Sequence, residues 1–374
     1  MICFIKKKDC IFAILFIYKL IYEMMEDNTK QDPLVSVGVP VYNVEPFIEK
    51  CLLSVLNQSY HNIEIVTVDD CGNDNSMEIV YDLQKNHPRG NCIKVIKQPF
   101  NKGLGEARNT AIDSATGKYL YFLDSDDFIE PETIEIMTKE AERHHTDAVL
   151  SSARCVNHET GEITPSFTYK SYEIIDGENA FGNFVCANLR WNITVTSWNI
   201  LFSVVFLRKN HLYFSIRTSE DSLFLSDYYS CIKKAVLLPN ITYNYVIRKG
   251  SLMGYEARNV IPVWEIRERL KGDALMTERS NRLKHRPFYD AHCARVMKHK
   301  FRAVCVCLRH RNHFTERLSD KEIGEDLRHP ATLSEILHFK RYKLFNLGFY
   351  LLGCLPYSIS VKIAHIVGKS IRWI

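Results

Sequence analysis

Short apolar runs and segments with apolar residues every three or four positions alternate along the first third of the chain. Runs rich in β-branched and aromatic residues predict four buried strands, which begin at Leu34, Ile63, Cys92 and Tyr119. Amphipathic spacing predicts helices over Val44–Gln58, over Met77–Asn86, and from the loop at Asn101–Gly105 through Ala115. Strands that alternate with helices at this spacing predict a parallel sheet covered by helices on both faces.

The pattern changes in the rest of the chain. Residues 181–251 are rich in aromatic side chains, and beyond about residue 256 charged helical sequence continues to about residue 343. Residues 344–361 contain no charged side chain, Pro356 interrupts them, and Lys362 and Lys369 follow. Three interpretations of this tail stay open: one membrane-spanning helix, an interfacial hairpin or amphipathic pair, or a helix packed on the core.

The N-terminal segment, residues 1–33, is expected to lie outside the catalytic domain. Three lysines precede the apolar run CIFAILFIY as in a signal peptide, but no small-residue cleavage site follows. Lys19 interrupts the run well short of the roughly 20 residues of a membrane-spanning helix. Either residues 1–23 come from a misassigned start, with Met24 or Met25 as the true one, or they form a short peripheral anchor.

Composition and charge narrow the class of protein. The 374 residues are 46% hydrophobic and 25% charged, as in a folded globular chain, and a net charge of +4 gives no reason to expect a nucleic-acid partner. Residues 284–311 are locally basic, with Asp290 as the single acid; they could face phosphates, RNA or an anionic membrane, or form a solvated helix face. Twelve scattered cysteines without a CxxC pair indicate reduced thiols in the cytoplasm.

Candidate chemistry begins with the run YLYFLDSDDF, where a strand ends in three carboxylates. Strand alternation predicts that Asp124 and Asp126 share a face and that Ser125 points away. Two carboxylates held together suit Mg²⁺ or Mn²⁺, whose remaining ligands would be a diphosphate and water. The same alternation turns Asp127 away, as a cap of the helix opened by Pro131 or as a supporting acid.

Other polar residues follow the remaining strand ends, where ligands of open α/β sheets bind. Asp70 could accept hydrogen bonds from a base or ribose, or could only form a turn. The segment NKGLGEAR offers backbone N–H groups and Arg108 to a phosphate or to the acidic site, and it matches neither the Walker nor the dinucleotide fingerprint. Glu220 and Asp221 precede an apolar helical run, so they are either capping acids or a general base.

These segments together resemble the family 2 glycosyltransferases of the GT-A fold, in the bacterial branch that builds capsular, exopolysaccharide or lipopolysaccharide chains. The resemblance covers residues 34–251 and rests on LVSVGVPVYN, VDDCGNDNS, NKGLGEAR, the DSDD run, Trp198, the SED triplet and YNYVIRKGS. It implies a Rossmann-like mixed sheet flanked by helices over residues 34–255, followed by a helical C-terminal region over 256–374. It also implies a metal-dependent, inverting transfer of a sugar from a nucleotide-diphosphate sugar, a UDP-sugar, to a hydroxyl of a glycan or lipid-linked saccharide.

The resemblance also assigns roles to residues. Asp221 would be the catalytic base with Glu220 beside it, and Asp126 with Asp124 would hold Mn²⁺ or Mg²⁺. Trp198 would lie on the acceptor side. The residues implied to bind the nucleotide sugar are Pro40, Tyr42, Asn43, Asp70 as the reader of the base, Asn101, Gly103, Arg108, Asp124 and Arg248.

Some positions depart from the family pattern. Val246 and Ile247 stand where many relatives have a basic residue, which leaves Arg248 as the candidate contact to the diphosphate, and Ile200 replaces a common lysine near Trp198. Two alternatives remain, a non-catalytic sugar-binding protein of this fold and a sugar-1-phosphate nucleotidyltransferase, although VSVGVPVYNVEP lacks the basic residues of the latter. The expected location is cytoplasmic, peripheral on the inner face of the cytoplasmic membrane.

Overall fold

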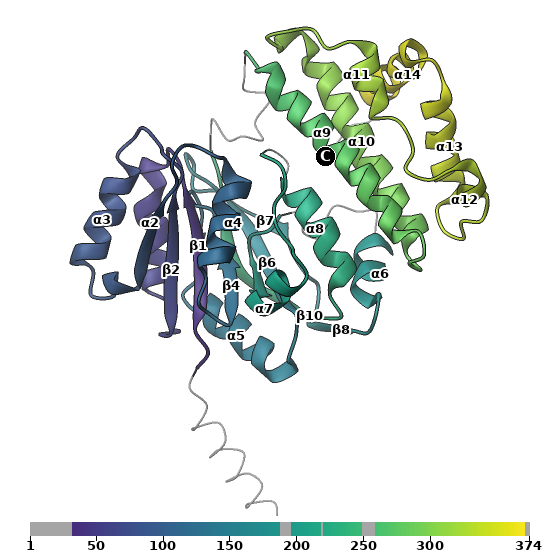
Figure 1. Ribbon diagram of the computed structural model, residues 1–374. Helices are drawn as coiled ribbons and strands as arrows, with labels where there is room; N and C mark the ends of the chain where they lie inside the picture. Colours follow the sequence, from purple (N-terminus) through teal and green to yellow (C-terminus); the bar gives the residue numbers. More distant parts are fainter. Residues whose placement is uncertain (1–31, 188–195, 218–219, 249–258, 371–374) are drawn as a thin grey trace, which may run out of the picture.

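A computed structural model describes residues 32–187, 196–217, 220–248 and 259–370 of the chain. Its first part is built on one mixed sheet with the strand order β3-β2-β1-β4-β9-β6-β10-β5, to which β7 is added beside β6 and β8 beside β10 (Figure 1). The strands are β1 Val35–Val41, β2 Ile63–Asp69, β3 Ile93–Lys97, β4 Tyr119–Phe122, β5 Phe128–Ile129, β6 Ala148–Asn157, β7 Ile163–Phe167, β8 Glu173–Asp176, β9 Ile200–Ser203 and β10 Lys234–Ile247.

The first four strands run parallel and confirm the prediction from hydrophobic pattern. Val35 of β1 pairs with Ile63 of β2 on one side and with Tyr119 of β4 on the other. Every residue of β1 and β4 is buried, which explains why these strands read as continuous apolar runs rather than as alternating ones. The helices between them are α2 Glu45–Leu56, α3 Ser76–Asn86 and α4 Leu104–Ser114.

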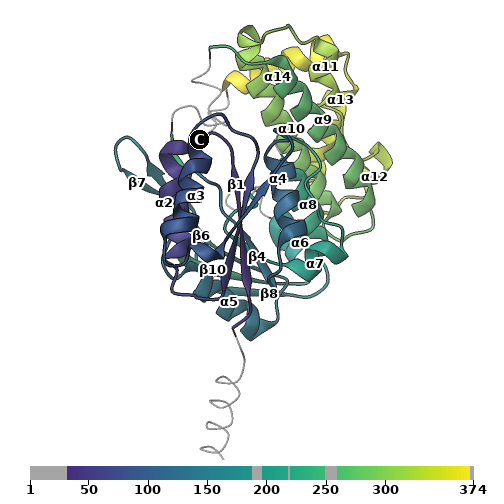
Figure 2. The ribbon, with the colours of Figure 1, turned by 60° about the vertical axis from the view of Figure 1, so that its left-hand side comes forward.

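The second half of the sheet is mixed. Strand β9 inserts between β4 and β6 and is antiparallel to both, whereas β6 and β10 are parallel to each other. Helices cover both faces of the sheet, with α2 and α3 on one face and α4, α7 and α8 on the other (Figure 2). The helices of this half are α5 Thr133–His144, α6 Ala180–Ala187, α7 Val204–Lys209 and α8 Glu220–Cys231. The described sheet with its flanking helices has the GT-A architecture.

The C-terminal region is helical, as predicted, and has its own apolar core around Ile266, Val304, Leu318 and Val361. Its basic helix α10 is only partly a solvated face, because Lys300 is buried 3.8 Å from Asp326. None of the helices in the described ranges has the length and hydrophobicity needed to cross a bilayer. The helices are α9 Val263–Ser280, α10 Tyr289–His310, α11 Asp320–Glu325, α12 Leu333–Leu337, α13 Lys343–Cys354 and α14 Tyr357–Ser370.

Two sequence expectations concern residues that the structure does not describe. The N-terminal segment lies almost entirely within residues 1–31, and the end of the YNYVIRKGS motif lies within residues 249–258. Ser219 of the SED triplet also lies outside the described ranges. The interpretations of these residues stay predictions.

Candidate active site

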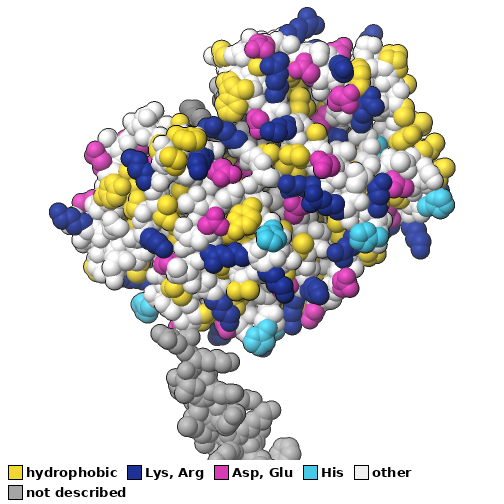
Figure 3. All heavy atoms as spheres, viewed as in Figure 1, with side chains coloured by type: hydrophobic (Ala, Val, Ile, Leu, Met, Phe, Trp, Pro, Cys, Tyr) yellow, Lys and Arg dark blue, Asp and Glu magenta, His cyan; other side chains and the backbone are white. Residues whose placement is uncertain are grey.

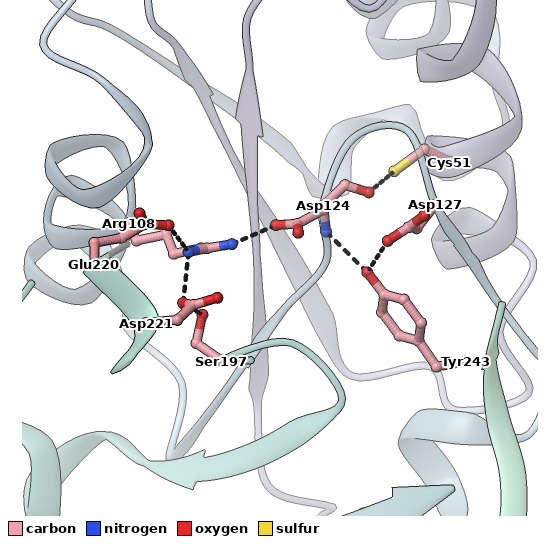
Figure 4. A network of polar contacts seen from close by, with 8 residues as sticks. All are labelled: Cys51, Arg108, Asp124, Asp127, Ser197, Glu220, Asp221 and Tyr243. Atoms are coloured by element: carbon pink, nitrogen blue, oxygen red, sulfur yellow. Dashed lines mark hydrogen bonds and ion pairs between the residues drawn. The ribbon is translucent and has the colours of Figure 1, made fainter. Parts of the chain in front are cut away.

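The first feature of the site is a buried arginine that contacts three carboxylates. Arg108 of α4 is 1% exposed, and its Nη2 donates to Asp124 Oδ1 at 2.6 Å. Its Nη1 donates to Glu220 Oε1 and to Asp221 Oδ1, both at 2.9 Å. In Figure 4 the guanidinium lies between Asp124 on one side and the two acids of α8 on the other. Four residues that the sequence analysis selected in separate motifs therefore form one ionic cluster.

Two glycines explain why α4 and α8 come close enough to build this cluster. Gly103 adopts φ 92°, a conformation that favours glycine, immediately before α4 begins. A Cβ on Gly105 would lie 2.8 Å from the carbonyl oxygen of Ile216 and 3.4 Å from Cβ of Glu220. The missing side chain thus lets the first turn of α4 approach the segment that leads into α8. Arg108 is carried one turn further along α4 and meets the acids of α8.

Burial makes negative charge costly at the start of α8. Burial and the charge of Asp221 raise the pKa of Glu220 to about 7. Burial also raises the pKa of Asp221, although the Arg108 guanidinium and the Ser197 hydroxyl oppose the change. Three carboxylates share one guanidinium here, and the pKa of about 7 means that Glu220 binds a proton close to neutral pH.

Ser197 fixes the orientation of Asp221. The Ser197 hydroxyl is buried and donates to Asp221 Oδ1 at 2.6 Å, on the same oxygen that Arg108 contacts. Two donors on Oδ1 hold the carboxylate plane and direct Oδ2 elsewhere. Sequence reasoning missed Ser197, and the one signal for it was its position next to Trp198.

Trp198 lies in the core rather than on an open surface. Its ring is 3% exposed and stacks on Tyr243 at a centroid distance of 4.4 Å and on Tyr245 at 5.7 Å. Because the ring is buried, a contact with an acceptor would need a rearrangement. Its effect on the site in this structure is to place Ser197.

The acidic run lies in a turn rather than at the end of a strand. Strand β4 ends at Phe122, and the N–H of Asp127 donates to the carbonyl oxygen of Asp124 at 3.0 Å. The alternation that assigned Asp124 and Asp126 to one face therefore does not extend this far. The residues after Phe122 take their orientation from the turn.

The helix-cap interpretation of Asp127 is wrong. Helix α5 begins after Glu132, and the Asp127 carboxylate is instead buried against β10. It accepts hydrogen bonds from the Tyr243 hydroxyl at 2.6 Å and from the N–H of Val246 at 2.7 Å. Burial, with the charges of the two neighbouring acids, raises the pKa of Asp127 well above its usual value. The Tyr243 hydroxyl oxygen also accepts the N–H of Asp124 at 3.3 Å, so the turn is anchored twice to β10.

Asp126 forms a second arginine pair at the rim of the site. Arg248 Nε donates to Asp126 Oδ2 at 2.8 Å, and its guanidinium lies 5.0 Å from the centre of the Phe47 ring. Burial and the nearby charge of Asp124 raise the pKa of Asp126, while Arg248 opposes the change. Arg248 thus reaches the acidic turn, where the sequence placed its contact to a diphosphate.

The acidic turn has a donor set that a divalent cation can use. Within the described ranges, no group of three or more His, Cys, Asp or Glu side chains is arranged to hold a metal ion. Asp124 and Asp126 are nevertheless two neighbouring carboxylates, each with one oxygen paired to an arginine. Mg²⁺ commonly binds through one or two carboxylates and completes its shell with substrate phosphates and water. The residues fit a cation that arrives with a diphosphate.

Asp70 and the loop before α4 form one edge of the site. Both carboxylate oxygens of Asp70 accept backbone N–H groups, from Lys102 at 2.8 Å and from Gly103 at 2.9 Å. The guanidinium of Arg217 donates to Asn101 Oδ1 in the same loop. In this structure Asp70 fixes the loop that precedes Arg108, and its assignment as a reader of the base stays a prediction.

The loop after β1 lies beside that edge. Asn43 adopts φ 51° and its Oδ1 accepts the N–H of Asn73 at 2.7 Å, so the loops after β1 and β2 are bonded together. Pro40 is buried within β1, whereas the ring of Tyr42 is 46% exposed. An exposed aromatic ring at a strand end suits stacking on a base.

The mixed sheet, the acidic turn after β4 and the acids at the start of α8 define the class of GT-A proteins. Residues 36–197 match the family model described as Glycosyl transferase family 2, and this segment of the chain belongs to that family. The family prediction from the sequence is confirmed.

Named relatives agree with this assignment. The chain is 33% identical over 225 residues to Glycosyltransferase GlyA of Streptococcus pneumoniae, covering 59% of this chain and 32% of GlyA. It is 32% identical over 227 residues to Putative glycosyltransferase EpsH of Bacillus subtilis, covering 60% of this chain and 63% of EpsH. It is also 33% identical to the chondroitin synthase of Escherichia coli, covering 48% of this chain and 25% of that enzyme. The chain thus spans less than two thirds of the length of each.

Solved structures show the same fold. The crystal structure of S. aureus TarS 1-349 in complex with UDP superposes with a TM-score of 0.61 at 19% identity, covering 91% of this chain and 92% of that one. A crystal structure of the same TarS region in complex with UDP-GlcNAc superposes with a TM-score of 0.52 at 22% identity. The likeness extends beyond the sheet into the helical C-terminal region.

Proposed function

We propose that this protein is an inverting glycosyltransferase that moves a sugar from a UDP-sugar to a hydroxyl of a glycan or lipid-linked saccharide during synthesis of a cell-surface polysaccharide. The observation that carries the proposal is the Arg108 cluster, which joins the acidic turn to the two acids of α8. The UDP and UDP-GlcNAc complexes of TarS support the donor class, and the chondroitin synthase relative supports the product class.

Asp221 is the proposed catalytic base. Arg108 and Ser197 both occupy its Oδ1, so the proton of the acceptor hydroxyl would move to Oδ2. The acceptor oxygen then forms a bond to the anomeric carbon as the bond to the diphosphate breaks on the opposite face. This direct displacement inverts the configuration at the anomeric carbon.

Asp124 and Asp126 are the proposed residues on the donor side. A divalent cation held between them and the diphosphate would neutralise the charge that develops on the leaving group. Arg248 already contacts Asp126, so a small movement of its side chain would bring the guanidinium to the same phosphates. Arg108 contacts the acids of both sides and would hold the base at a fixed distance from the donor.

We place the reaction in the cytoplasm, at the inner face of the cytoplasmic membrane. The cysteines of the described residues are all free thiols, which suits a reducing compartment. Lipid-linked saccharide acceptors would be reached from that surface.

Two substitutions test the assignment of roles. Asp126→Ala should abolish cation-dependent binding of the donor in calorimetric titration, because it removes one of two carboxylate ligands. Asp221→Asn should leave donor binding nearly unchanged and remove transfer, because an amide cannot take the proton. Asp82→Asn, an exposed acid on α3 that contacts Asn86, is the matched control and should change neither measurement.

The first assay is release of nucleoside diphosphate from a panel of nucleotide sugars, with and without Mn²⁺ and acceptor glycans. Transfer by Asp221→Asn at a rate near that of the wild type would contradict the base assignment. Cation-dependent binding of donor without turnover on any acceptor would instead favour a non-catalytic sugar-binding protein of this fold.

A further inference from the structure

The outward faces of α13 and α14 expose a continuous set of large apolar side chains. In α13 the exposed residues follow the spacing i, i+4 and i+7, with Gly348 at the second position, and in α14 they follow i, i+4, i+7 and i+8. Either spacing corresponds to one side of a helix. Figure 3 shows hydrophobic side chains gathered along the edge of the molecule where these helices lie. The residues are Leu344 and Leu351 in α13, Leu355 immediately after it, and Ile359, Ile363, Ile366 and Val367 in α14.

The opposite sides of both helices already pack on the protein. In α14 the buried residues are Val361, Ala364 and Gly368, and the last two contact Cys305 of α10. In α13, Asn346 is buried and donates to the carbonyl oxygen of Asp290 on α10 at 3.1 Å. The outward apolar face is therefore additional to the face that stabilises the fold. Leu344, at 83% exposed, and Ile366, at 60%, contribute little to that core.

The charged side chains of α13, α14 and the segments next to them in the chain have one sign. Residues 338–374 contain no aspartate or glutamate. Lys343 lies at the start of α13, and in α14 Lys362 lies four residues before Ile366 and Lys369 three residues after it; all three lysines are exposed. Lys340, just before α13, is exposed as well. An apolar face on helices that carry lysines and no acid is complementary to an anionic surface with an apolar layer beneath it.

We propose that this face, the outward sides of α13 and α14, docks on a membrane that contains anionic lipids. The helices would lie in the plane of the interface, with leucine and isoleucine side chains at the boundary of headgroups and acyl chains and the lysines at the lipid phosphates. A second copy of the chain fits less well, because a symmetric contact would bring the two sets of lysines together. The inference concerns the helical region alone and does not depend on sugar transfer.

Flotation of the purified full chain with lipid vesicles tests the proposal. The wild type should float with vesicles of phosphatidylglycerol and phosphatidylethanolamine and much less with pure phosphatidylcholine. The variant Leu344→Ser, Leu351→Ser, Ile366→Ser should lose at least about tenfold in partition coefficient, because three apolar anchors are removed. Its control is Val205→Ser, Ile163→Ser, Ile174→Ser, which changes exposed apolar residues outside the face and should float like the wild type.

A second variant separates the charge from the apolar contribution. Lys343→Gln, Lys362→Gln, Lys369→Gln should lower partition onto the anionic vesicles by about fivefold for each lysine at low salt, with little effect on neutral vesicles. Far-UV circular dichroism and thermal unfolding should match the wild type for both variants, since the changed side chains are exposed.

Three results would overturn the proposal. The wild type fails to float with anionic vesicles, or the apolar variant floats as well as its control. In the third, light scattering shows that the wild type is an oligomer and that the apolar variant is a monomer, while the two float equally well. The face would then be a contact between copies of the chain. Donor hydrolysis measured without vesicles should be equal in wild type and variants, so a failure here is distinguishable from a failure of the proposed catalysis.

Discussion

Replacing Arg108 with methionine removes the only cation that Asp124, Glu220 and Asp221 share within hydrogen-bond distance in the described structure. Methionine keeps an unbranched side chain of similar length and leaves three acids without their guanidinium. Lysine would not substitute, because a single ammonium lacks the planar fork that reaches Asp124 with one nitrogen and the α8 acids with the other.

The expected loss follows from burial. Arg108 is 1% exposed, and breaking a buried ion pair by removing one partner costs about 3 to 5 kcal/mol, because the remaining charge stays buried. The loss should depend on pH. Arg108 lowers the pKa of Glu220, which is about 7 in the folded protein, and opposes the rise at Asp221, so its removal raises both further. The deficit should be largest above pH 7 and should shrink toward about pH 5, because Glu220 then binds a proton and no longer needs the guanidinium.

Urea unfolding of wild type and variant at pH 5.5 and pH 8 measures this difference. Arg208→Met is the matched control, because Arg208 donates to the backbone carbonyls of Ile112 and Ala115 rather than to acids, and its loss should be equal at the two pH values. An Arg108→Met deficit that is the same at both pH values, or that stays below about 1 kcal/mol at pH 8, would show that the cluster does not have the electrostatics described here.

Three further predictions use the same unfolding assay. The free energy of unfolding of the wild type should fall as pH rises from about 4.5 to about 7, because folded Glu220 has a pKa of about 7, and Glu220→Gln should flatten that slope; an unchanged slope would refute this. Gly103→Ala should lower the free energy of unfolding by about 1 to 3 kcal/mol and should weaken donor binding. Gly161→Ala should lower the free energy of unfolding by less, because Gly161 also has positive φ but has open space around it. Tyr243→Phe should lower the free energy of unfolding by about 1 to 3 kcal/mol, because the buried carboxylate of Asp127 loses a hydrogen bond. The hydrogen bond lost in Tyr213→Phe is exposed, so that substitution should lower the free energy of unfolding by less. Equal losses would count against the anchoring role of Tyr243.

The parallel half of the fold was predictable because its signals are local. Strands β1 to β4 are apolar runs, and α2 and α3 have amphipathic spacing, so their bounds differ from the predicted ones by one or two residues. The short strands β5 and β9 were not predicted. Strand β9 has four residues and exists because β4 and β6 lie on either side of it, which no local pattern indicates.

The candidate site was also predictable only in part. The sequence identified Arg108, Asp124, Glu220 and Asp221 as candidates, each from its own motif. It gave no reason to place them on one guanidinium, and it misplaced Asp127, because strand alternation was applied to a run that lies in a turn. Tyr243 had no signal as a partner of that acid, since the two are 116 residues apart.

The sequence by itself determined which residues are candidates for the chemistry, because residue type and the spacing around strand ends are local properties of the chain. Only the tertiary structure decided which acid is paired, which is buried and which oxygen of Asp221 is held. Those outcomes depend on the approach of α4 to α8 at Gly105, and on contacts such as that between Arg108 and Glu220, which spans 112 residues. Burial then sets the pKa of each group, and burial is a property of the folded chain rather than of any segment.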